Sequence, residues 1–537
     1  MTEAGKPIFS TNHSKDVSRQ AALFQAIRTA VQGNDDALGL GELKSIHSGS
    51  LMIVFMEAGA ITLVSMIEKK GDDDEGIVET EAFARIQLEH VYAQLIFSMT
   101  DHAQKILAQN PGFDLASMVT ATEKKLLNGI LNKCGPDGSD VGQFLTGSVE
   151  TVFPIPHNLR NQASKALHSI NVPNTVFGIL LVGGRLLSLV QSSFRPHQLR
   201  VSDLQLIINV VDQNKTALAS SELWIPMCLP RFNTSGFLYT YIRCLDEMSQ
   251  LKLILISTHN TTEQFQLFHT ASDLIRKDMH IPSAKDTVLK IDTTSSQDTP
   301  TSGTKSDVAW FLAECSFDDS IEEGYVSIGQ AQDQQLLLDA IQKSCEPSSF
   351  EQLLERYAAT KDEESLFHFV FRLDVKVRSE SNQRAGQLSQ CISTPMLLQD
   401  DDAKNSRRRR VHVMYQKLSL RLRLGSATVE STMDALDMIA ADDKGAFDPS
   451  SSFPTLTSTC PSIGLAESPP NVHGITYIVD GDEIFLGMNG RDFEFYMTIR
   501  NKVPIKQAAA IGTKLVRRLK AEEKDLFLTN PMTWDAR

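Results

Sequence analysis

The chain is poor in cysteine, with seven residues scattered over 537 positions and no C-x-x-C pair. Zinc sites and disulfide frameworks need closely spaced or paired cysteines, so the sequence predicts a reduced, cytoplasmic chain without a metal or other cofactor. Long apolar runs are missing as well. The longest apolar stretch, 172–190, contains a proline, three glycines and an arginine, so we expect no membrane-spanning helix.

Basic side chains are outnumbered, because 52 lysines and arginines face 66 acidic residues and give a net charge of −14. Phosphate contacts require a basic surface, so this balance argues against a dedicated nucleic-acid-binding protein. The motifs G-x-x-x-x-G-K-[ST], G-x-G-x-x-G, H-E-x-x-H and G-x-S-x-G are also absent. An unrecognised enzyme is a disfavoured alternative, because no nucleophile, base and orienting group can be paired from the sequence.

Changes in composition divide the chain into blocks. Residues 133–140 form a turn cluster rich in Gly, Pro and Asp, and residues 282–307 are poor in large apolar side chains. We therefore predict a first domain at 1–150, a second at 158–281, a linker at 282–307 and a third domain at 308–537. Within the third domain, residues 379–406 and 425–472 are expected to form long loops.

An internal repeat is the most informative feature of the sequence. Three pairs of apolar segments are separated by glycine-containing dipeptides, which indicates β-hairpins whose tight turns need a positive φ. The predicted turns are Ala58-Gly59, Gly183-Gly184 and Asp480-Gly481. A helical pattern follows each hairpin, at Glu81–Ala108, Val201–Leu218 and Pro504–Phe527. Three copies of one α+β module explain this recurrence, although hairpins followed by helices are common in unrelated folds.

The first block also contains a helix before its hairpin. Apolar residues recur there at helical spacing, at Val17, Ala21, Phe24, Ile27 and Val31. Asp16 is a suitable N-cap and Gly33 a suitable end. With a strand predicted at Lys6–Thr11, the order becomes strand, helix, hairpin and long helix. A small antiparallel sheet with helices against it, similar to longin and profilin-like domains, is the expected arrangement.

Two segments concentrate positive charge without any acidic residue, +8 in 404–424 and +7 in 500–520. Lys417–Leu424 alternates leucine with polar and basic residues, which predicts a strand with one leucine face and one cationic face. In the second segment, Ile505, Ala508, Leu515, Val516 and Leu519 share one predicted helix face. Both segments can offer charge to an anionic membrane, or can simply be solvated faces. The candidate membrane-binding residues are Arg407, Arg408, Arg409, Arg410, Lys417, Arg421, Arg423, Arg517 and Arg518.

Three short segments resemble the SAND/Mon family of vacuolar and lysosomal fusion proteins. They are Glu3–Ser10 (EAGKPIFS), Lys44–Gly49 (KSIHSG) before an Ile-Val-Phe strand, and Lys524–Leu528 (KDLFL). The resemblance covers essentially the whole folded chain and implies an α+β fold of three longin-like domains, each an antiparallel sheet flanked by helices. Family members usually carry residues before the Ala-Gly-Lys-Pro motif, so the first strand is expected to be truncated here.

The resemblance also implies a function. Members of this family act with an obligate Ccz-family longin partner as a guanine-nucleotide exchange factor for the late-endosomal Rab GTPase. Together with this role, the two basic segments predict peripheral recruitment from the cytoplasm to endosomal and lysosomal or vacuolar membranes, through an anionic, phosphoinositide-containing surface. Nucleic acid is not an expected partner. A longin-domain trafficking adaptor or tether without exchange activity is the alternative.

The resemblance places the GTPase-binding surface on the first longin domain. No catalytic side chain is expected, because an exchange factor of this kind acts by binding. The candidate contact residues are a surface prediction and not a motif match. Gln20, Gln25 and Arg28 are predicted on the outer face of the first helix, and Lys44, Ser45 and His47 before the sheet.

Overall fold

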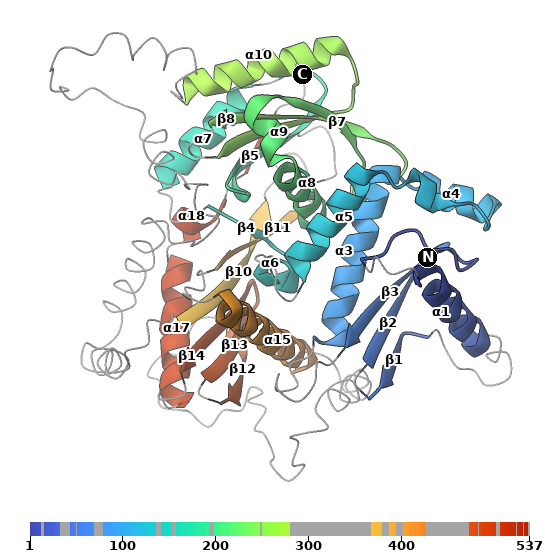
Figure 1. Ribbon diagram of the computed structural model, residues 1–537. Coiled ribbons are helices and arrows are strands. Elements are labelled where there is room, and N and C mark those ends of the chain that lie inside the picture. Colours follow the sequence, from blue (N-terminus) through green and yellow to red (C-terminus); the bar gives the residue numbers. More distant parts are fainter. Residues whose placement is uncertain are drawn as a thin grey trace. The chain divides into compact units, whose positions relative to one another are not determined.

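Figure 1 shows the helices and strands of the computed structural model. Its residues group into two compact units. Unit 1 contains Met1–Gly147, Asn233–Gly236 and Asp400–Ala508, and unit 2 contains Ser148–Phe232, Phe237–Gln399 and Ala509–Arg537. Each is described by itself. The structure describes residues 1–11, 16–32, 43–49, 51–68, 79–135, 141–152, 157–170, 172–192, 198–246, 250–279, 367–377, 386–393, 401–425, 472–481, 483–500, 505–521, 523–529 and 531–534. The predicted linker 282–307 lies outside these residues, and the predicted domain boundaries stay a prediction.

The first module of unit 1 is an antiparallel meander between two helices. It consists of α1 (Val17–Gln32), β1 (Ser45–Ser48), β2 (Leu51–Ala58), β3 (Ile61–Glu68) and α3 (Glu81–Met99), with the strand order β1-β2-β3. Ala58 pairs with Ile61, so the turn is Gly59-Ala60, one residue later than predicted. Gly59 has a φ of +62°, which explains the need for glycine in this turn.

The start of the chain does not form the predicted strand at Lys6–Thr11. Thr2 instead makes an isolated bridge to Ile61, and the backbone N–H of Thr62 donates to the Met1 carbonyl at 2.9 Å. A turn follows at once, because the N–H of Gly5 donates to the Thr2 carbonyl. Pro7 has no N–H to contribute to a strand ladder. Ile8 is buried in the core of this module, so the segment is held by packing and not by a β-ladder.

Helix α3 is shorter than the predicted Glu81–Ala108. It ends at Met99, where Thr100 adopts a φ of +59°, and a separate helix α4 (His102–Gln109) follows. The chain continues through a 3-10 turn (Leu115–Met118), α5 (Ala121–Cys134) and α6 (Val141–Thr146). Because α3 packs against strands β2 and β3 and also against α5 and α6, it is buried on more than one side.

The C-terminal part of unit 1 contains one long helix and a three-stranded meander. These are α15 (Asp401–Gly425), β12 (Val472–Asp480), β13 (Glu483–Gly490) and β14 (Phe493–Arg500). Asp480 pairs with Glu483, and Gly481 has a φ of +54°, so the predicted hairpin is present with its turn shifted by one residue.

The predicted strand Lys417–Leu424 is wrong, because these residues belong to α15. Their alternation is part of a longer helical pattern, in which Val411, Tyr415, Leu418 and Leu422 are all buried. The helix lies close to the meander because Gly487 lacks a side chain: a Cβ there would come within 3.2 Å of Leu422 and 3.3 Å of Leu418. The predicted loop 379–406 is also wrong in part, since it contains strand β11 and the start of α15. Residues 426–471, nearly all of the predicted loop 425–472, lie outside the described residues.

Unit 2 contains a six-stranded sheet with helices against it. Its elements are α7 (His157–Ser169), β5 (Thr175–Val182), β6 (Arg185–Ser192), α8 (Val201–Gln213), α9 (Lys215–Ser220), β7 (Leu223–Met227), β8 (Leu238–Asp246), β9 (Leu251–Ser257), α10 (Thr262–Asp278) and β15 (Met532–Trp534). The strand order is β15-β6-β5-β9-β8-β7, in which only β15 is parallel to its neighbour. The predicted turn Gly183-Gly184 is confirmed, because Val182 pairs with Arg185 across it.

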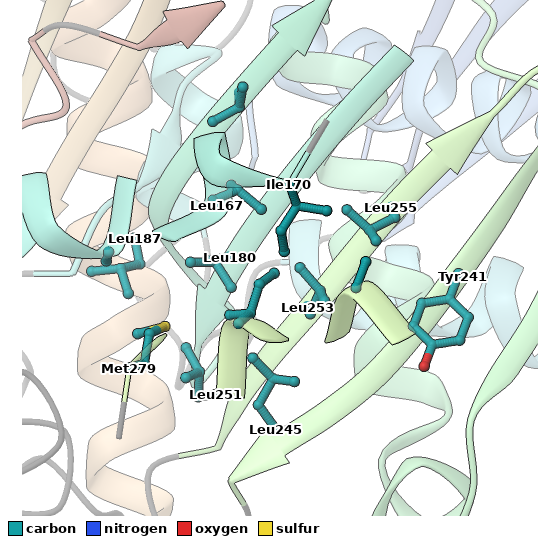
Figure 2. Packing of buried hydrophobic residues seen from close by; sticks show 14 of the residues in the cluster. Leu167, Ile170, Leu180, Leu187, Tyr241, Leu245, Leu251, Leu253, Leu255 and Met279 are labelled. Carbon is teal, nitrogen blue, oxygen red and sulfur yellow. The ribbon is translucent and has the colours of Figure 1, made fainter. Parts of the chain in front are cut away.

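The core of this sheet combines aliphatic side chains with the rings of Tyr241, Phe268 and Trp534. Figure 2 shows leucines of β5, β6 and β9 meeting side chains from α7 and Met279, which follows α10. Trp534 of β15 extends this cluster, and its indole N–H donates to the His168 carbonyl at 3.0 Å. Gly178 makes room for the indole, because a Cβ at this position would lie 2.6 Å from the Trp534 ring. The second module therefore buries a segment from far along the chain.

The same order of elements occurs twice in full. Hairpin β5–β6, helix α8, strands β7 to β9 and helix α10 correspond to hairpin β10–β11, helix α15, strands β12 to β14 and helix α17. The additional bounds are β10 (Phe367–Val377), β11 (Gly386–Ser393), α17 (Ile505–Ala521), α18 (Glu523–Leu526) and β4 (Val149–Glu150), which runs parallel to β11. The first module shows the part of this order that follows the leading hairpin: helix α1, strands β1 to β3 and helix α3. The module therefore recurs in the order of the elements, but the three predicted hairpins are not equivalent: β5–β6 precedes the first helix of its module, whereas β2–β3 and β12–β13 lie among the three strands that follow that helix.

Candidate functional site

Three of the predicted contact residues lie on or beside strand β1. The hydroxyl of Ser45 donates to Glu81 Oε2 at 2.8 Å, and His47 Nε2 lies 3.5 Å from the same oxygen. Arg85, one turn further along α3, donates from Nε at 3.2 Å and from a terminal nitrogen at 2.8 Å to Glu81 Oε1. Lys44 is exposed at the start of the strand. We call Ser45, His47, Glu81 and Arg85 the Glu81 cluster.

Glu81 is the centre of this cluster. Burial of its carboxylate acts to raise its pKa, but the hydrogen bonds from Arg85 and Ser45, with the positive charge of Arg85, outweigh burial and hold the pKa below its usual value. The carboxylate is therefore ionised at neutral pH and fixed by several donors. Arg85 also donates to the Phe55 carbonyl at 3.2 Å, which ties α3 to strand β2.

Arg28 does not lie on the outer face of α1, so its predicted role as a surface contact is wrong. It is only 8% exposed, forms an ion pair with Glu57, and donates to the Thr62 hydroxyl at 2.8 Å. These partners lie at the end of β2 and the start of β3. Arg28 therefore connects α1 to the sheet. Among the exposed residues of this helix is one large apolar side chain, Leu23, at 57% exposure.

Gln20 and Gln25 are half-buried on α1. Nε2 of Gln25 lies 3.5 Å from the Thr29 hydroxyl, one turn further along the same helix. No hydrogen bond among those described connects either glutamine with the Glu81 cluster. The structure therefore brings together the predicted residues of β1, but not those of α1.

The arginines of α15 are largely engaged with the β12–β13 hairpin. Arg407 pairs with Glu483 at 2.8 Å, and Arg410 pairs with Asp480 at 2.9 Å while also donating to its carbonyl. Arg421 donates to the Tyr477 carbonyl at 3.3 Å, and Arg423 lies 3.5 Å from the Leu145 carbonyl. This part of the basic segment therefore has a structural role.

The remaining candidates for membrane contact are less informative. Arg408, Arg409, Lys417 and Arg517 are half-buried, and the side chain of Arg518 is outside the described residues. The predicted apolar face of α17 is confirmed by the burial of Ala508, Leu515, Val516 and Leu519. In the described part of the chain no group of three metal-ligating side chains occurs. No helix there combines the length and apolar character needed to span a membrane.

Sequence reasoning missed Thr80, Glu81, Arg85 and Gln416. Thr80 caps α3, because its hydroxyl accepts from the Phe83 N–H at 3.3 Å, and the amide of Gln416 in turn accepts from Thr80. A threonine before an apolar periodic segment is a readable capping signal. No sequence signal links Gln416 to Thr80, because 336 residues separate them.

Family models match both N-terminal modules. Residues 1–128 match the first longin domain of FUZ, MON1 and HPS1, and residues 173–275 match the second longin domain of the same proteins. The first match contains α1, β1 to β3 and α3, and the second contains β5 to β9 and most of α10. The chain is therefore a longin-domain protein.

Individual curated proteins that match the chain are SAND and MON1 proteins. Protein SAND of Takifugu rubripes is 29% identical over 260 residues, which are 48% of this chain and 46% of that protein. Human vacuolar fusion protein MON1 homolog B is 30% identical over 284 residues, 52% of this chain and 48% of the relative. MON1 of Yarrowia lipolytica is 27% identical over 253 residues, 47% and 43% of the two chains. The matched part of the chain is therefore similar to SAND and MON1 proteins, and the chain spans about half the length of the curated relatives it matches.

Proposed function

We propose that this chain is one subunit of a guanine-nucleotide exchange factor that activates a late-endosomal or vacuolar Rab GTPase. Through this activity it promotes endosome maturation and vesicle-mediated transport to, and fusion with, the lysosome or vacuole. The observation that carries the proposal is the pair of longin domains matched to MON1-type models, in a chain whose relatives are named vacuolar fusion proteins.

An exchange factor of this kind acts by binding and needs no catalytic side chain. Rab proteins hold nucleotide with roughly picomolar affinity, about −16 kcal/mol. A protein that prefers the nucleotide-free conformation weakens nucleotide binding by the same factor by which nucleotide weakens its own binding. A standard interface of about 1,600 Å² can supply this differential free energy.

The Glu81 cluster supports the choice of surface. Side chains of Lys44 and His47 are exposed, while Ser45 and Arg85 are partly covered and hydrogen-bonded to Glu81. A fixed backbone with exposed polar side chains suits recognition of a partner, because little conformational entropy is lost on binding. We therefore assign Lys44 and His47 to the GTPase contact, with the Glu81 carboxylate holding the strand in place.

A Ccz-family longin protein is the proposed obligate partner. Leu23 on α1 is 57% exposed and Met66 on β3 is 47% exposed, both within the first longin domain. Contiguous apolar patches mark surfaces that a partner covers, so these two side chains are positions at which contact with the partner can be tested. With the partner in place, the GTPase-binding surface would be shared between two longin domains.

Recruitment to an anionic, phosphoinositide-containing membrane is proposed for the basic segments. Basic residues near such a surface contribute about 1 kcal/mol each. Arg407 and Arg410 are poor positions for testing this, because their replacement would break the ion pairs with Glu483 and Asp480. Arg408→Ser with Arg409→Ser leaves those two ion pairs intact, and reduced sedimentation with anionic liposomes is the expected result.

Release of fluorescent nucleotide from candidate Rab proteins tests the exchange function. We expect slow release with the chain alone and fast release with the Ccz-type partner added. Lys44→Glu should slow the stimulated reaction, whereas Lys105→Ala, an exposed change on α4, serves as the matched surface control. Absence of stimulation with the partner present would contradict exchange activity and favour a trafficking adaptor.

A further inference from the structure

Helix α15 reaches the beginning of helix α3 through one buried side chain. The amide oxygen of Gln416 accepts the backbone N–H of Thr80 at 3.0 Å and the Thr80 hydroxyl at 3.3 Å. Both residues are only 3% exposed. The contact therefore joins two segments of unit 1 that are far apart in the sequence.

Thr80 lies where helix α3 begins, next to Glu81. It is the N-cap of α3, where its hydroxyl accepts the Phe83 N–H while donating to Gln416. Capping groups fix where a helix begins, since they satisfy N–H groups that have no partner inside the helix. The next residue is Glu81, whose carboxylate holds Ser45 and lies beside His47. A shift of the cap would therefore move the carboxylate that positions β1.

Gln416 is presented by a helix that is itself firmly held. Arg407 and Arg410 pair with acids at the two sides of the β12–β13 turn, and Leu418 and Leu422 pack over Gly487. These contacts lie before and after Gln416 on α15. Contacts with the C-terminal meander on both sides of Gln416 therefore fix the position of its amide.

The amide nitrogen of Gln416 supplies a second, independent observation. It is buried and has no hydrogen-bond partner in the described part of the chain. A buried N–H without a partner costs free energy, so an apolar side chain of similar length would serve packing equally well. An apolar residue could not accept the two hydrogen bonds that the amide oxygen of Gln416 receives from Thr80.

We propose that Gln416 is a positioning residue that couples helix α15 to the Glu81 cluster through the cap of α3. The link to nucleotide exchange rests on the function proposed above, whereas the structural coupling does not. Ligands or partners that engage the C-terminal meander thereby gain a physical route to the surface formed by β1.

Hydrogen exchange in the full chain tests the coupling directly. Gln416→Met keeps the length of the side chain and removes both acceptor contacts. Faster exchange is expected in peptides covering residues 80–85 and also in those covering 44–48. Gln205→Met is the matched control, since it removes a buried glutamine hydrogen bond in the second module, to the Ser148 carbonyl at 2.8 Å. The control should leave both peptides unchanged. Unchanged exchange at 44–48 in Gln416→Met would overturn the proposal.

A double-mutant cycle in nucleotide release separates positioning from general destabilisation. Ser45→Ala and Gln416→Met should each slow partner-stimulated release about three- to tenfold, and the double variant should be no slower than the worse single variant. Additive losses would overturn the coupling. Should Gln416→Met fail to fold, Gln416→Leu removes the same two acceptor contacts and is held to the same outcomes. If wild type stimulates no release, the proposed function fails, and hydrogen exchange alone decides the coupling.

Discussion

Two carboxylates in the first turns of helices, one in each matched longin domain, have pKa values shifted in opposite directions. Glu81 begins α3 and receives hydrogen bonds from Ser45 and Arg85, which hold its pKa below the usual value despite burial. Asp203 lies in the first turn of α8 and is fully buried. Burial raises its pKa to about 6, although the backbone N–H groups of Arg231 and Phe232 act in the other direction.

The difference shows what decides the charge state of a buried acid. For Glu81, a guanidinium one turn along the same helix compensates for lost hydration. For Asp203, only Oδ1 is engaged by the Arg231 N–H at 3.1 Å, and Oδ2 has no hydrogen-bond partner in the described part of the chain. Partners outweigh burial in the first case and fail to do so in the second.

The largest change in the free energy of unfolding is expected from Asp203→Asn, which should stabilise the protein at pH 7. Because its pKa rises from 3.8 to about 6 on folding, the protonated form is favoured in the native state. The stability that Asp203 contributes is therefore full below about pH 4 and is lost as the pH rises through about 6. At pH 7 the ionisation of Asp203 lowers the free energy of unfolding of the wild type by roughly 3 kcal/mol, and Asp203→Asn should restore this amount. Urea unfolding of both proteins at pH 4 and pH 7 measures this, and parallel pH profiles would contradict it.

Glu81→Gln should have a smaller effect with the opposite dependence on pH. A lowered pKa means that Glu81 stabilises the native state above about pH 4.5 and that this contribution disappears as the pH falls through the native pKa. At pH 7 the variant should lose about 1 kcal/mol, since the Arg85 side chain is 28% exposed and water screens the pair. Equal unfolding midpoints of variant and wild type at pH 7, with a difference only in acid, would reverse our account of the cluster.

Lys105→Ala should have the smallest effect. Lys105 pairs with Asp101 at 3.1 Å, but the two side chains are 61% and 30% exposed. Such pairs contribute less than about 0.5 kcal/mol. Thermal unfolding should therefore place this variant within about 2 °C of wild type. A loss as large as that of Glu81→Gln would show that exposure does not separate the two ion pairs.

Turn chemistry made the hairpins predictable. Gly59, Gly183 and Gly481 all adopt positive φ values in two-residue turns. Because glycine is the residue that such turns require, the local sequence is enough to predict them. The exact turn was off by one residue at Gly59 and Gly481, because the dipeptide alone does not define the register of the strands. Helices follow the hairpins at Gly59 and Gly183 directly, whereas strand β14 comes between the hairpin at Gly481 and helix α17.

Other features depend on contacts that are remote in sequence. Helix α3 ends at Thr100, which adopts a positive φ although threonine rarely does so. No local sequence pattern predicts this end. Lys417–Leu424 looked like a strand because an eight-residue window hides the helical spacing from Val411 to Leu422. Within the candidate site, Ser45 and His47 could be predicted only as surface positions near the first sheet, without a motif to select them. Arg28 could not be placed correctly, because its partners Glu57 and Thr62 become neighbours only in the folded sheet.

Strand β15 has a consequence for the synthesis of the chain. Residues 532–534 form the parallel partner of β6, while α10, the last helix of that module, ends at Asp278. Ribosomes add about 5 to 20 residues per second, so the roughly 250 intervening residues take about 10 to 50 s to make. During this interval the edge of β6 and the space above Gly178 lack their native cover. An unpaired edge strand is a template for wrong pairing, so chaperone binding to nascent chains should be strongest in this window.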